Sequence, residues 1–341
     1  MAPAVLIEGL QKSYGSVEAI KDVSLIIESG EIFGLLGPNG AGKTTTIRCL
    51  CTLTRPNQGK IEVNGISVLD NPRAARQCLG YIAQEVALDK MLTGREMLQL
   101  QADLYHIPAK VSKDRIAQML DLLDLNDWAD QKTGIYSGGL KKRLDLAAGL
   151  LHQPDVLVLD EPTVGLDIES RSSVWRFIRE LKAAGTTILL TSHYLEEVDV
   201  LGDRVAIIDG GEVIARGTPS ALKDEVGGDR ITLRIREFTP PDEAESARTL
   251  LETLPCVQEV IVNSAQGNSL NLVVDAQANA LVSVQQSLST AGLPTFGISQ
   301  SRPSLDDVYL AATGRTLMDA ELAAVGSRDL KAERKQSMKG S

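Results

Sequence analysis

The N-terminal part of the chain alternates short, continuously apolar runs with longer segments whose apolar residues recur every three or four positions. Runs of the first kind occupy residues 31–36, 156–161 and 186–191. A continuous apolar run of this length is typical of a strand buried on both faces of a parallel sheet. A helix is expected to follow the first run, from residue 43 through residue 53. The pattern therefore predicts an α/β fold.

Between the first two runs the pattern becomes helical. Apolar residues spaced three and four apart cover residues 94–106 and 112–125, and Ser112 is in position to cap the second of these helices. A further helix is expected to open at Ser137, a good N-cap, and to end near residue 153. We expect these segments to form a helical subdomain over about residues 87–150.

After Gly227-Gly228, a natural linker, alternating strands appear. The order β-α-β-β-α-β, followed by one more helix, predicts a small ferredoxin-like α+β domain. The strands are expected near residues 231–235, 257–262, 270–274 and 295–299, and the helices over 242–254, 279–291 and 304–312. We therefore expect one domain over residues 1–226, a second over 229–315 and a charged, flexible tail over 316–341.

Composition and charge narrow the class of protein. The chain has 341 residues, a net charge of −10 and a pI near 5.0, so a protein that binds nucleic acid through a basic face is disfavoured. No run approaches the roughly 18 apolar residues of a membrane-spanning helix, and no signal-peptide pattern opens the chain. Four cysteines without C-x-x-C spacing or histidine partners are expected only to pack, and we expect a cytoplasmic location.

The most specific motif spans residues 37–44 and reads G-P-N-G-A-G-K-T, a complete G-x-x-x-x-G-K-[ST] loop between a predicted strand and a predicted helix. Glycines in such a loop turn backbone N–H groups inward, where they cradle phosphates. Lys43 is expected to reach the β- and γ-phosphates and Thr44 to ligate Mg²⁺. The predicted nucleotide-binding residues here are Gly37, Pro38, Asn39, Gly40, Ala41, Gly42, Lys43, Thr44 and Thr45.

Two carboxylates end the apolar run at residues 156–161. Ligands of open α/β sheets bind at the carboxyl ends of the strands, so Asp160 is predicted to hold the Mg²⁺ shell. Glu161 is turned away from it and is the candidate to orient or deprotonate the attacking water. A simple strand end would also read this way, but the phosphate-binding loop disfavours that alternative. The two motifs together predict ATP hydrolysis.

Further motifs resemble those of the nucleotide-binding subunit of an ATP-binding cassette (ABC) transporter. They are, in chain order, Tyr14 (an aromatic that stacks on adenine), Gln84 (the Q-loop), Ser137-Gly138-Gly139 (the signature), Asp167 in Gly165-Leu166-Asp167 (the D-loop) and His193 (the switch histidine). Each residue alone would more often be a solvated turn or a satisfied loop side chain. Their order and spacing are what make the resemblance specific.

The resemblance implies a fold and a mechanism. The fold is that of a P-loop NTPase of the ABC type, with Glu161, His193 and Gln84 as catalytic residues. Mg²⁺ would be held by Thr44, Asp160 and Gln84, largely through water. Because the signature of one ABC subunit contacts ATP held by its partner, a chain with one loop and one signature implies a homodimer with two composite sites. The dimer would drive a separately encoded polytopic permease from the cytoplasmic face of the membrane.

The signature departs from the usual Leu-Ser-Gly-Gly-Gln at both ends. Tyr136 replaces the leucine, and Leu140 replaces the glutamine, which is expected to remove a polar side chain near the nucleotide. Three cations follow at residues 141–143, at the end of a helix that disfavours positive charge; they are expected to face either a phosphate or solvent. The sequence Y-S-G-G with hydrophobic and basic residues after it resembles the daunorubicin-type drug exporters.

Residues 303–309 also resemble the end of the drug-exporter type of ATPase subunit. The second domain carries no catalytic pairing, so we interpret it as an accessory domain that stabilises a dimer or regulates it, with a small-molecule sensor as the alternative. A drug-like or hydrophobic cargo is expected for the transporter. The alternative function is an ABC ATPase that transports nothing, such as a translation factor or a DNA-repair clamp. Those relatives usually carry two cassettes or long coiled coils, which this sequence lacks.

Overall fold

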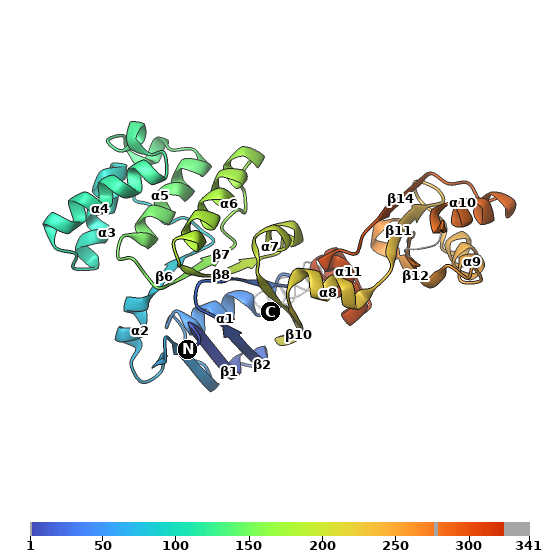
Figure 1. Cartoon of the computed structure of the whole chain (residues 1–341), viewed down its shortest axis with the longest axis horizontal. Helices are drawn as coiled ribbons and strands as arrows, with labels where there is room; N and C mark the ends of the chain where they lie inside the picture. The colour runs from blue at the N-terminus through green and yellow to red at the C-terminus, as the bar shows by residue number, and fades with distance from the viewer. Residues whose placement is uncertain (1, 276–278, 324–341) are drawn as a thin grey trace, which may run out of the picture. The chain divides into compact units, whose positions relative to one another are not determined.

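The computed structural model describes residues 2–275 and 279–323, and the chain divides into two compact units, Met1–Pro219 and Ser220–Ser341 (Figure 1). The division falls at the start of helix α8 (Pro219–Val226) rather than after it. Among the described residues, no helix combines the length and apolar character that crossing a bilayer would require.

The first unit is built on a ten-stranded sheet with the order β5-β4-β1-β2-β10-β9-β3-β8-β7-β6. Its strands are β1 (Val5–Tyr14), β2 (Val17–Ile27), β3 (Ile32–Leu36), β4 (Gln58–Val63), β5 (Ile66–Ser67), β6 (Leu79–Ile82), β7 (Val156–Asp160), β8 (Thr187–Ser192), β9 (Arg204–Asp209) and β10 (Glu212–Gly217). Strands β6, β7, β8, β3 and β9 run parallel, and β3, β7 and β8 are buried along their whole length. The carboxyl ends of these strands therefore meet at one edge, where the predicted motifs follow them.

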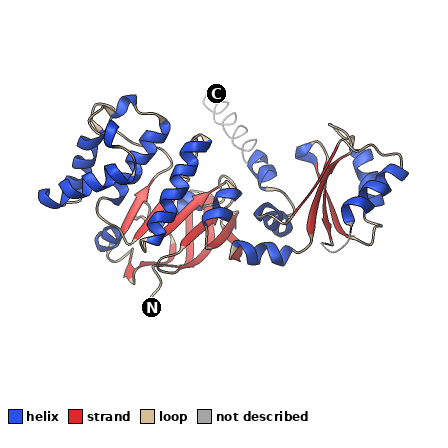
Figure 2. Ribbon diagram, turned by 45° about the horizontal axis from the view of Figure 1, so that its top comes forward, coloured by secondary structure: helices blue, strands red, loops and turns tan. Residues whose placement is uncertain are grey.

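Helices cover this sheet and extend beyond its β6 edge (Figures 1 and 2). They are α1 (Lys43–Leu50), α2 (Pro72–Cys78), α3 (Gly94–Leu104), α4 (Ala109–Leu122), α5 (Gly138–Leu150), α6 (Ile168–Ala183) and α7 (Leu195–Leu201), with short 3-10 turns at Asn126–Trp128 and Thr133–Ile135. An apolar cluster under β1, β2, β4 and α1 forms one part of the core, and a second cluster joins α3 to α6 with the inner strands.

The helical subdomain differs from the sequence prediction at its helix starts. The prediction that Ser112 caps a helix is wrong: the helix begins three residues earlier, after Pro108, and Ser112 is buried within it, where its hydroxyl donates to the carbonyl of Ala109. Helix α3 begins where expected, but its capping box is made by Thr93 and Glu96. Pro108, with its fixed backbone φ, precedes α4, and no side chain caps this helix. A prediction based on a serine N-cap therefore placed the start of the helix too late.

The second unit confirms the ferredoxin-like order. Its elements are β11 (Asp229–Arg234), α9 (Pro241–Leu251), β12 (Val257–Asn263), a 3-10 turn (Ser264–Gln266), β13 (Ser269–Val274), α10 (Ala280–Thr290), β14 (Gly297–Ser301) and α11 (Leu305–Thr313). The strands form an antiparallel sheet in the order β12-β13-β11-β14. Apolar side chains of α9 and α10 pack on one face of that sheet and form its core.

The prediction of a flexible tail from residue 316 is wrong for residues 316–323. Residues 317–323 are helical, and Leu317 and Ala320 are buried. Thr316 caps this segment through Asp319, and the N–H of Leu317 donates to Asp306 Oδ1 at 3.0 Å. Residues 324–341, the rest of the predicted tail, lie outside the described residues.

Candidate ATP-binding and hydrolysis site

The phosphate-binding loop joins β3 to α1, as the sequence predicts. Two of its glycines are required by close packing as well as by backbone conformation. Gly37 has φ 154°, and a Cβ there would lie 2.1 Å from the carbonyl oxygen of Ile208. Gly42, the N-cap of α1, has φ 114°, and a Cβ there would lie 2.8 Å from the carbonyl oxygen of Ala19. The loop therefore exposes a compact turn of backbone at the start of a helix.

Lys43 lies inside this loop and is only 4% exposed. Its ammonium donates to the carbonyls of Gly37 at 2.6 Å and Pro38 at 3.2 Å. The same nitrogen lies 3.7 Å from Glu161 Oε1. A buried ammonium in this position places a positive charge between the loop and the carboxyl end of β7.

The two carboxylates at the end of β7 point in different directions. Asp160 Oδ1 accepts a hydrogen bond from Thr191 Oγ1 at 2.6 Å and lies 3.5 Å from Thr44 Oγ1. Glu161 has φ 49°, the left-handed region that non-glycine residues seldom occupy, and its N–H donates to Thr191 Oγ1 at 3.0 Å. The left-handed backbone at Glu161 separates its side chain from that of Asp160. Backbone strain of this kind collects at functional sites.

Glu161 is the centre of a cluster that joins residues far apart in the sequence. Its Oε2 accepts a hydrogen bond from Gln84 Nε2 at 2.8 Å, and its Oε1 lies 3.3 Å from His193 Nδ1. Burial alone would raise the pKa of Glu161, but the hydrogen bond with His193 and the charge of Lys43 together lower it below its ordinary value. The carboxylate is therefore ionised at neutral pH and able to accept a proton.

The neighbouring carboxyl behaves in the opposite way. Burial raises the pKa of Asp160, and the negative charge of Glu161 raises it further, whereas the hydrogen bond from Thr191 lowers it. A carboxylate kept in an environment that disfavours its charge is stabilised by a nearby cation. With the hydroxyl of Thr44 beside it, Asp160 offers oxygen ligands of the kind that Mg²⁺ prefers.

The signature and the D-loop lie next to each other. Ser137 caps α5 and accepts a hydrogen bond from the N–H of Leu140, and Ser137 and Gly138 are exposed. A Cβ on Gly139 would lie 2.5 Å from Ser170 Oγ, so the signature packs directly against the start of α6. Asp167 caps α6 by accepting from the N–H of Ser170 at 2.8 Å. These groups form a surface cluster at two helix N-termini.

The remaining predicted nucleotide contacts are partly accessible, with Pro38 and Ala41 of the loop buried. Tyr14 is the last residue of β1 and is 46% exposed, with Lys12 Nζ 5.0 Å from the centre of its ring. Asn39, Gly40 and Thr44 of the loop are exposed, and Thr45 is half-buried. The aromatic face and the loop are therefore open to a ligand from solvent.

The unusual residues of the signature are part of the helical core. Leu140 is buried and packs with the apolar cluster of the subdomain; that it removes a polar side chain near the nucleotide stays a prediction. The expectation that all three following cations face a phosphate or solvent is wrong for Lys142, which is 3% exposed and donates to a backbone carbonyl. Arg143 also donates to a carbonyl, that of Leu123. The sequence showed cations near a helix end that disfavours positive charge. It did not show that two of these side chains donate to backbone carbonyls.

Tyr136 anchors the signature to the helical subdomain. Its hydroxyl donates to the carbonyl of Trp128, and the two rings meet edge to face. We expect Tyr136→Phe to lower the free energy of unfolding by about 0.5–1.5 kcal/mol, because one part-buried hydrogen bond is lost while the N–H of Gln131 still donates to the same carbonyl. Urea unfolding followed by Trp fluorescence would measure this. Tyr105→Phe is the matched control, and an equal loss there would contradict a specific role for the Tyr136 hydroxyl.

Sequence reasoning missed Thr191. This residue ends the apolar run of β8 and pairs in register with Asp160 on β7, and it bonds to both carboxylate-bearing residues. The pattern that could have identified it is a hydroxyl residue at the end of a continuous apolar run, two positions before His193. Only the pairing of β7 with β8 shows that this hydroxyl faces the carboxylates.

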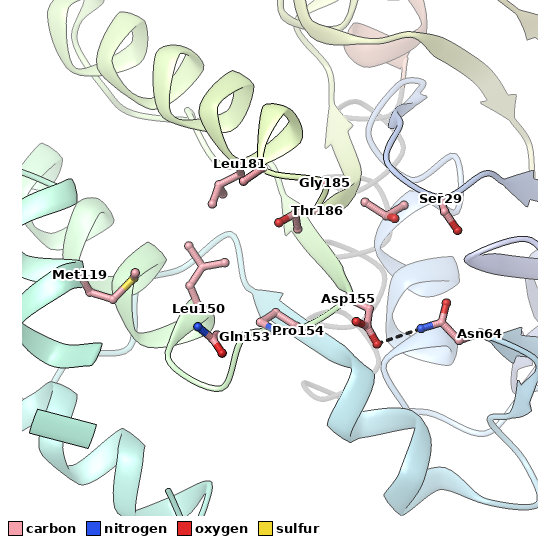
Figure 3. Close-up of a pocket in the computed structure, with 12 residues that line it drawn as sticks. Ser29, Asn64, Met119, Leu150, Gln153, Pro154, Asp155, Leu181, Gly185 and Thr186 are labelled. Carbon is pink, nitrogen blue, oxygen red and sulfur yellow. Dashed lines mark hydrogen bonds between the residues drawn. The ribbon is translucent and has the colours of Figure 1, made fainter. Parts of the chain in front are cut away.

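A separate cavity of about 500 Å³ lies where β7 and β8 begin, at the edge of the sheet opposite the motifs (Figure 3). Figure 3 shows Met119, Leu150 and Leu181 on one side and the bond from Asn64 Nδ2 to Asp155 Oδ2, 3.0 Å long, on the other. Its lining contains none of the predicted site residues. The nucleotide chemistry is therefore not assigned to this cavity.

Comparison with known proteins identifies the family. A family profile described as ABC transporter matches residues 20–164, and one described as an AAA domain matches residues 134–199. The chain is 41% identical over 311 residues to the daunorubicin resistance ATP-binding protein DrrA3 of Streptomyces coeruleorubidus, covering 91% of this chain and 96% of the relative. It is 35% identical over 316 residues to the linearmycin resistance ATP-binding protein LnrL of Bacillus subtilis, covering 92% and 99%.

Solved structures agree with this assignment. An ATP-binding subunit of an ABC transporter is 29% identical, with a TM-score of 0.61 over 66% of this chain and 93% of that one. The dimeric ATP-binding cassette MJ0796, in a post-hydrolysis state with ADP and Pi bound, is 25% identical, with a TM-score of 0.58 over 63% and 98%. The chain belongs to the ABC transporter family and is an ATP-binding, ATP-hydrolysing subunit of that family.

Proposed function

We propose that two copies of this chain close around two ATP molecules and that hydrolysis drives export of a drug-like or hydrophobic compound through a separate membrane permease. The observation that carries the hydrolytic part is the ionised Glu161 carboxylate, held between Lys43, Gln84 and His193. The names of the relatives, which include resistance to daunorubicin and linearmycin and Nod factor export, support the direction and the type of cargo.

ATP binding is assigned to the loop and to the groups around it. The backbone of residues 37–45 would cradle the phosphates, with the ammonium of Lys43 among them and the ring of Tyr14 against the base. Thr44 and Asp160 would hold Mg²⁺, with Gln84 contributing through water; their oxygens fit this hard cation. When bound, Mg²⁺ supplies positive charge to the phosphate oxygens.

Hydrolysis is assigned to the Glu161 cluster. Glu161 orients the attacking water and accepts its proton, since the hydrogen bond with His193 and the charge of Lys43 keep it ionised despite its burial. His193 lies beside Oε1 of Glu161, the oxygen that Lys43 also approaches, and would contact the γ-phosphate, while Gln84 fixes Oε2. Lys43 stabilises the charge that develops on the transferred phosphoryl group.

The signature is assigned to the ATP of the partner subunit. The exposed ends of Ser137 and Gly138 present backbone N–H groups at the start of α5, where an anion is favoured. Asp167 would lie in the same interface. Closure of the dimer excludes water from the reaction, and loss of the γ-phosphate removes the contacts that bridge the subunits. The difference in binding energy between the two states moves the permease.

We assign permease docking to a groove of about 500 Å³ between the end of α3 and the central sheet. Its rim carries Leu104 and Leu53, which are 65% and 54% exposed, and its lining includes Tyr105, Arg73 and Arg76. Exposed apolar side chains beside two arginines fit an apolar cytoplasmic segment of a membrane protein that carries acidic residues. Because the cytoplasm supplies ATP, the dimer would work at the cytoplasmic face of the membrane.

A pulldown from native membranes tests the transporter assignment. Tagged Glu161→Gln protein with ATP is expected to recover one polytopic membrane protein. Adding Leu104→Asp is expected to reduce recovery at least about tenfold, because the change removes an apolar contact and places a negative charge where the acidic segment would dock. Val200→Asp, an exposed apolar position on α7, is the matched control. Recovery of ribosomes or DNA-bound proteins would overturn transport, and equal recovery with Leu104→Asp would overturn the groove.

The second unit is proposed to stabilise or regulate the dimer. We place the linker between the two domains at Gly227 and Gly228 for this proposal, because both have positive φ. Its polar face and apolar core carry no cluster resembling the Glu161 site among the residues described. Deleting residues from 229 onward would test the role: the proposal expects intact ATP binding and weaker ATP-dependent dimers.

A further inference from the structure

Lys142 is a buried cation that the hydrolytic mechanism does not use. It is the fifth residue of α5, and its side chain is almost fully buried. Lysines are rarely buried to this extent unless they are paired. A residue that breaks a local rule in the interior needs a tertiary reason.

The reason is a contact with the strand that leads to Gln84. Lys142 Nζ donates a hydrogen bond to the carbonyl of Ala83 at 2.9 Å. Ala83 directly follows the end of β6 and directly precedes Gln84. The lysine therefore fixes the point at which the chain leaves the sheet, one residue before the side chain that holds Glu161.

A second partner of Lys142 lies on its own helix. Asp145 Oδ2 is 3.8 Å from Lys142 Nζ. Burial lowers the pKa of Lys142, and the negative charges of Asp145, Asp160 and Glu197 oppose that shift. Burial raises the pKa of Asp145 to about 6, against the charge of Lys142. The charge of Asp145 thus explains how the buried ammonium of Lys142 is tolerated. It does not explain why the ammonium extends to Ala83, the residue after β6.

We propose that Lys142 is a positioning residue that links the signature helix to the catalytic carboxylate. The contacts run from α5, whose N-cap is Ser137, through Lys142 to Ala83. They continue along the chain to Gln84 and from its Nε2 to Glu161. A movement of the signature that accompanies dimer closure would shift Gln84 through this link. The inference rests on the proposed function, which gives Gln84 and Glu161 their roles.

If Lys142 positions Gln84, we expect its substitution to lower the turnover of ATP. A role in packing alone predicts no specific change in turnover. Lys142→Met keeps the length of the side chain but cannot donate to Ala83. We expect kcat for ATP to fall about tenfold, a loss of ~1.4 kcal/mol in transition-state stabilisation, with KM and equilibrium ATP affinity changed less than about twofold. Lys142→Arg, which can still donate, is expected to restore most of kcat. The measurement is steady-state ATP hydrolysis by the purified full-length chain, with ATP binding and thermal unfolding recorded in parallel.

Two controls separate the link from the ion pair and from general charge. Asp145→Asn removes the charged partner but leaves the bond to Ala83, and Lys141→Met removes the neighbouring cation; both are expected to keep kcat near wild type. The double variant Lys142→Met/Asp145→Leu removes both charges of the buried pair, which is usually tolerated in folding. It replaces the single variant if that variant does not fold, and the same tenfold fall is expected.

Wild-type kcat in Lys142→Met, or in the double variant that replaces it, or an equal fall in Asp145→Asn, would overturn the link. A fall matched by the loss of folded, ATP-binding protein would overturn it as well, because that pattern marks a purely structural role. Glu161→Gln is measured in the same series. Turnover by that variant at the wild-type rate would instead overturn the proposed function, so the two failures are distinguishable.

Discussion

Glu161→Gln is expected to lower ATP turnover by about 10²–10⁴-fold, the usual contribution of a positioned general base, while ATP binding is retained. Glutamine keeps the size of the side chain but cannot accept the proton of the attacking water. Lys43 and the loop are unchanged, so ATP still enters the site and the closed dimer no longer reopens by hydrolysis. We expect dimers to accumulate with ATP and Mg²⁺ and to be absent with ADP.

Steady-state hydrolysis and size-exclusion chromatography with each nucleotide measure this result. Glu197→Gln is the matched control, since Glu197 is also a buried carboxylate but accepts a hydrogen bond from Trp175 Nε1 at 3.0 Å. We expect turnover of that variant to stay within about threefold of wild type, as the group does not contact the reacting atoms. Rapid hydrolysis by Glu161→Gln would remove Glu161 from the mechanism.

Lys43→Met is expected to abolish productive ATP binding. The ammonium is the charge closest to the loop interior, and removing one such group costs about 10²–10³-fold in catalysis where it stabilises developing charge. The substitution also removes a cation that lowers the pKa of Glu161, so that pKa is expected to rise. The loss of turnover is expected from the first effect, because Glu161 stays ionised at neutral pH after such a rise.

Calorimetric titration with ATP and thermal unfolding check the prediction for Lys43. ATP binding to the folded state raises the unfolding temperature of the wild-type chain by mass action, and we expect no such rise in Lys43→Met. Lys21→Met is the control, because Lys21 is a surface lysine whose partner is Glu212, 3.4 Å away. An ATP-dependent rise in Lys43→Met equal to that of the control would refute the assignment.

The sequence predicted the parallel part of the sheet better than the antiparallel part. Strands β3, β7 and β8 are buried on both faces, so their apolar runs are continuous and easy to recognise. Strand β1 pairs with shifts in register between Ile7 and Leu10, next to Gly9 with φ 57°. Such a bulge interrupts the alternation that marks a strand. The prediction from the sequence assigned no strand to residues 5–14.

In the candidate site too, some residues could be predicted from the sequence and others could not. The loop at residues 37–44 was predictable because its chemistry is local: the glycines, the lysine and the helix start are consecutive. Gln84 and His193 were assigned through the order of motifs, and their distances to Glu161 were not contained in that order. Thr191 and Lys142 were missed because their partners are carbonyl and carboxylate groups on other elements.

The sequence by itself determined the ABC type of ATPase, because consecutive residues form the loop and an ordered series of motifs identifies the family. Tertiary structure decided which groups surround Glu161 and how they set its pKa, since burial and charge depend on side chains brought together from separate strands. It also decided that Leu140 and Lys142 face inward. A helix in isolation does not specify which of its faces is covered, and only packing against β6 and the helical subdomain settles that.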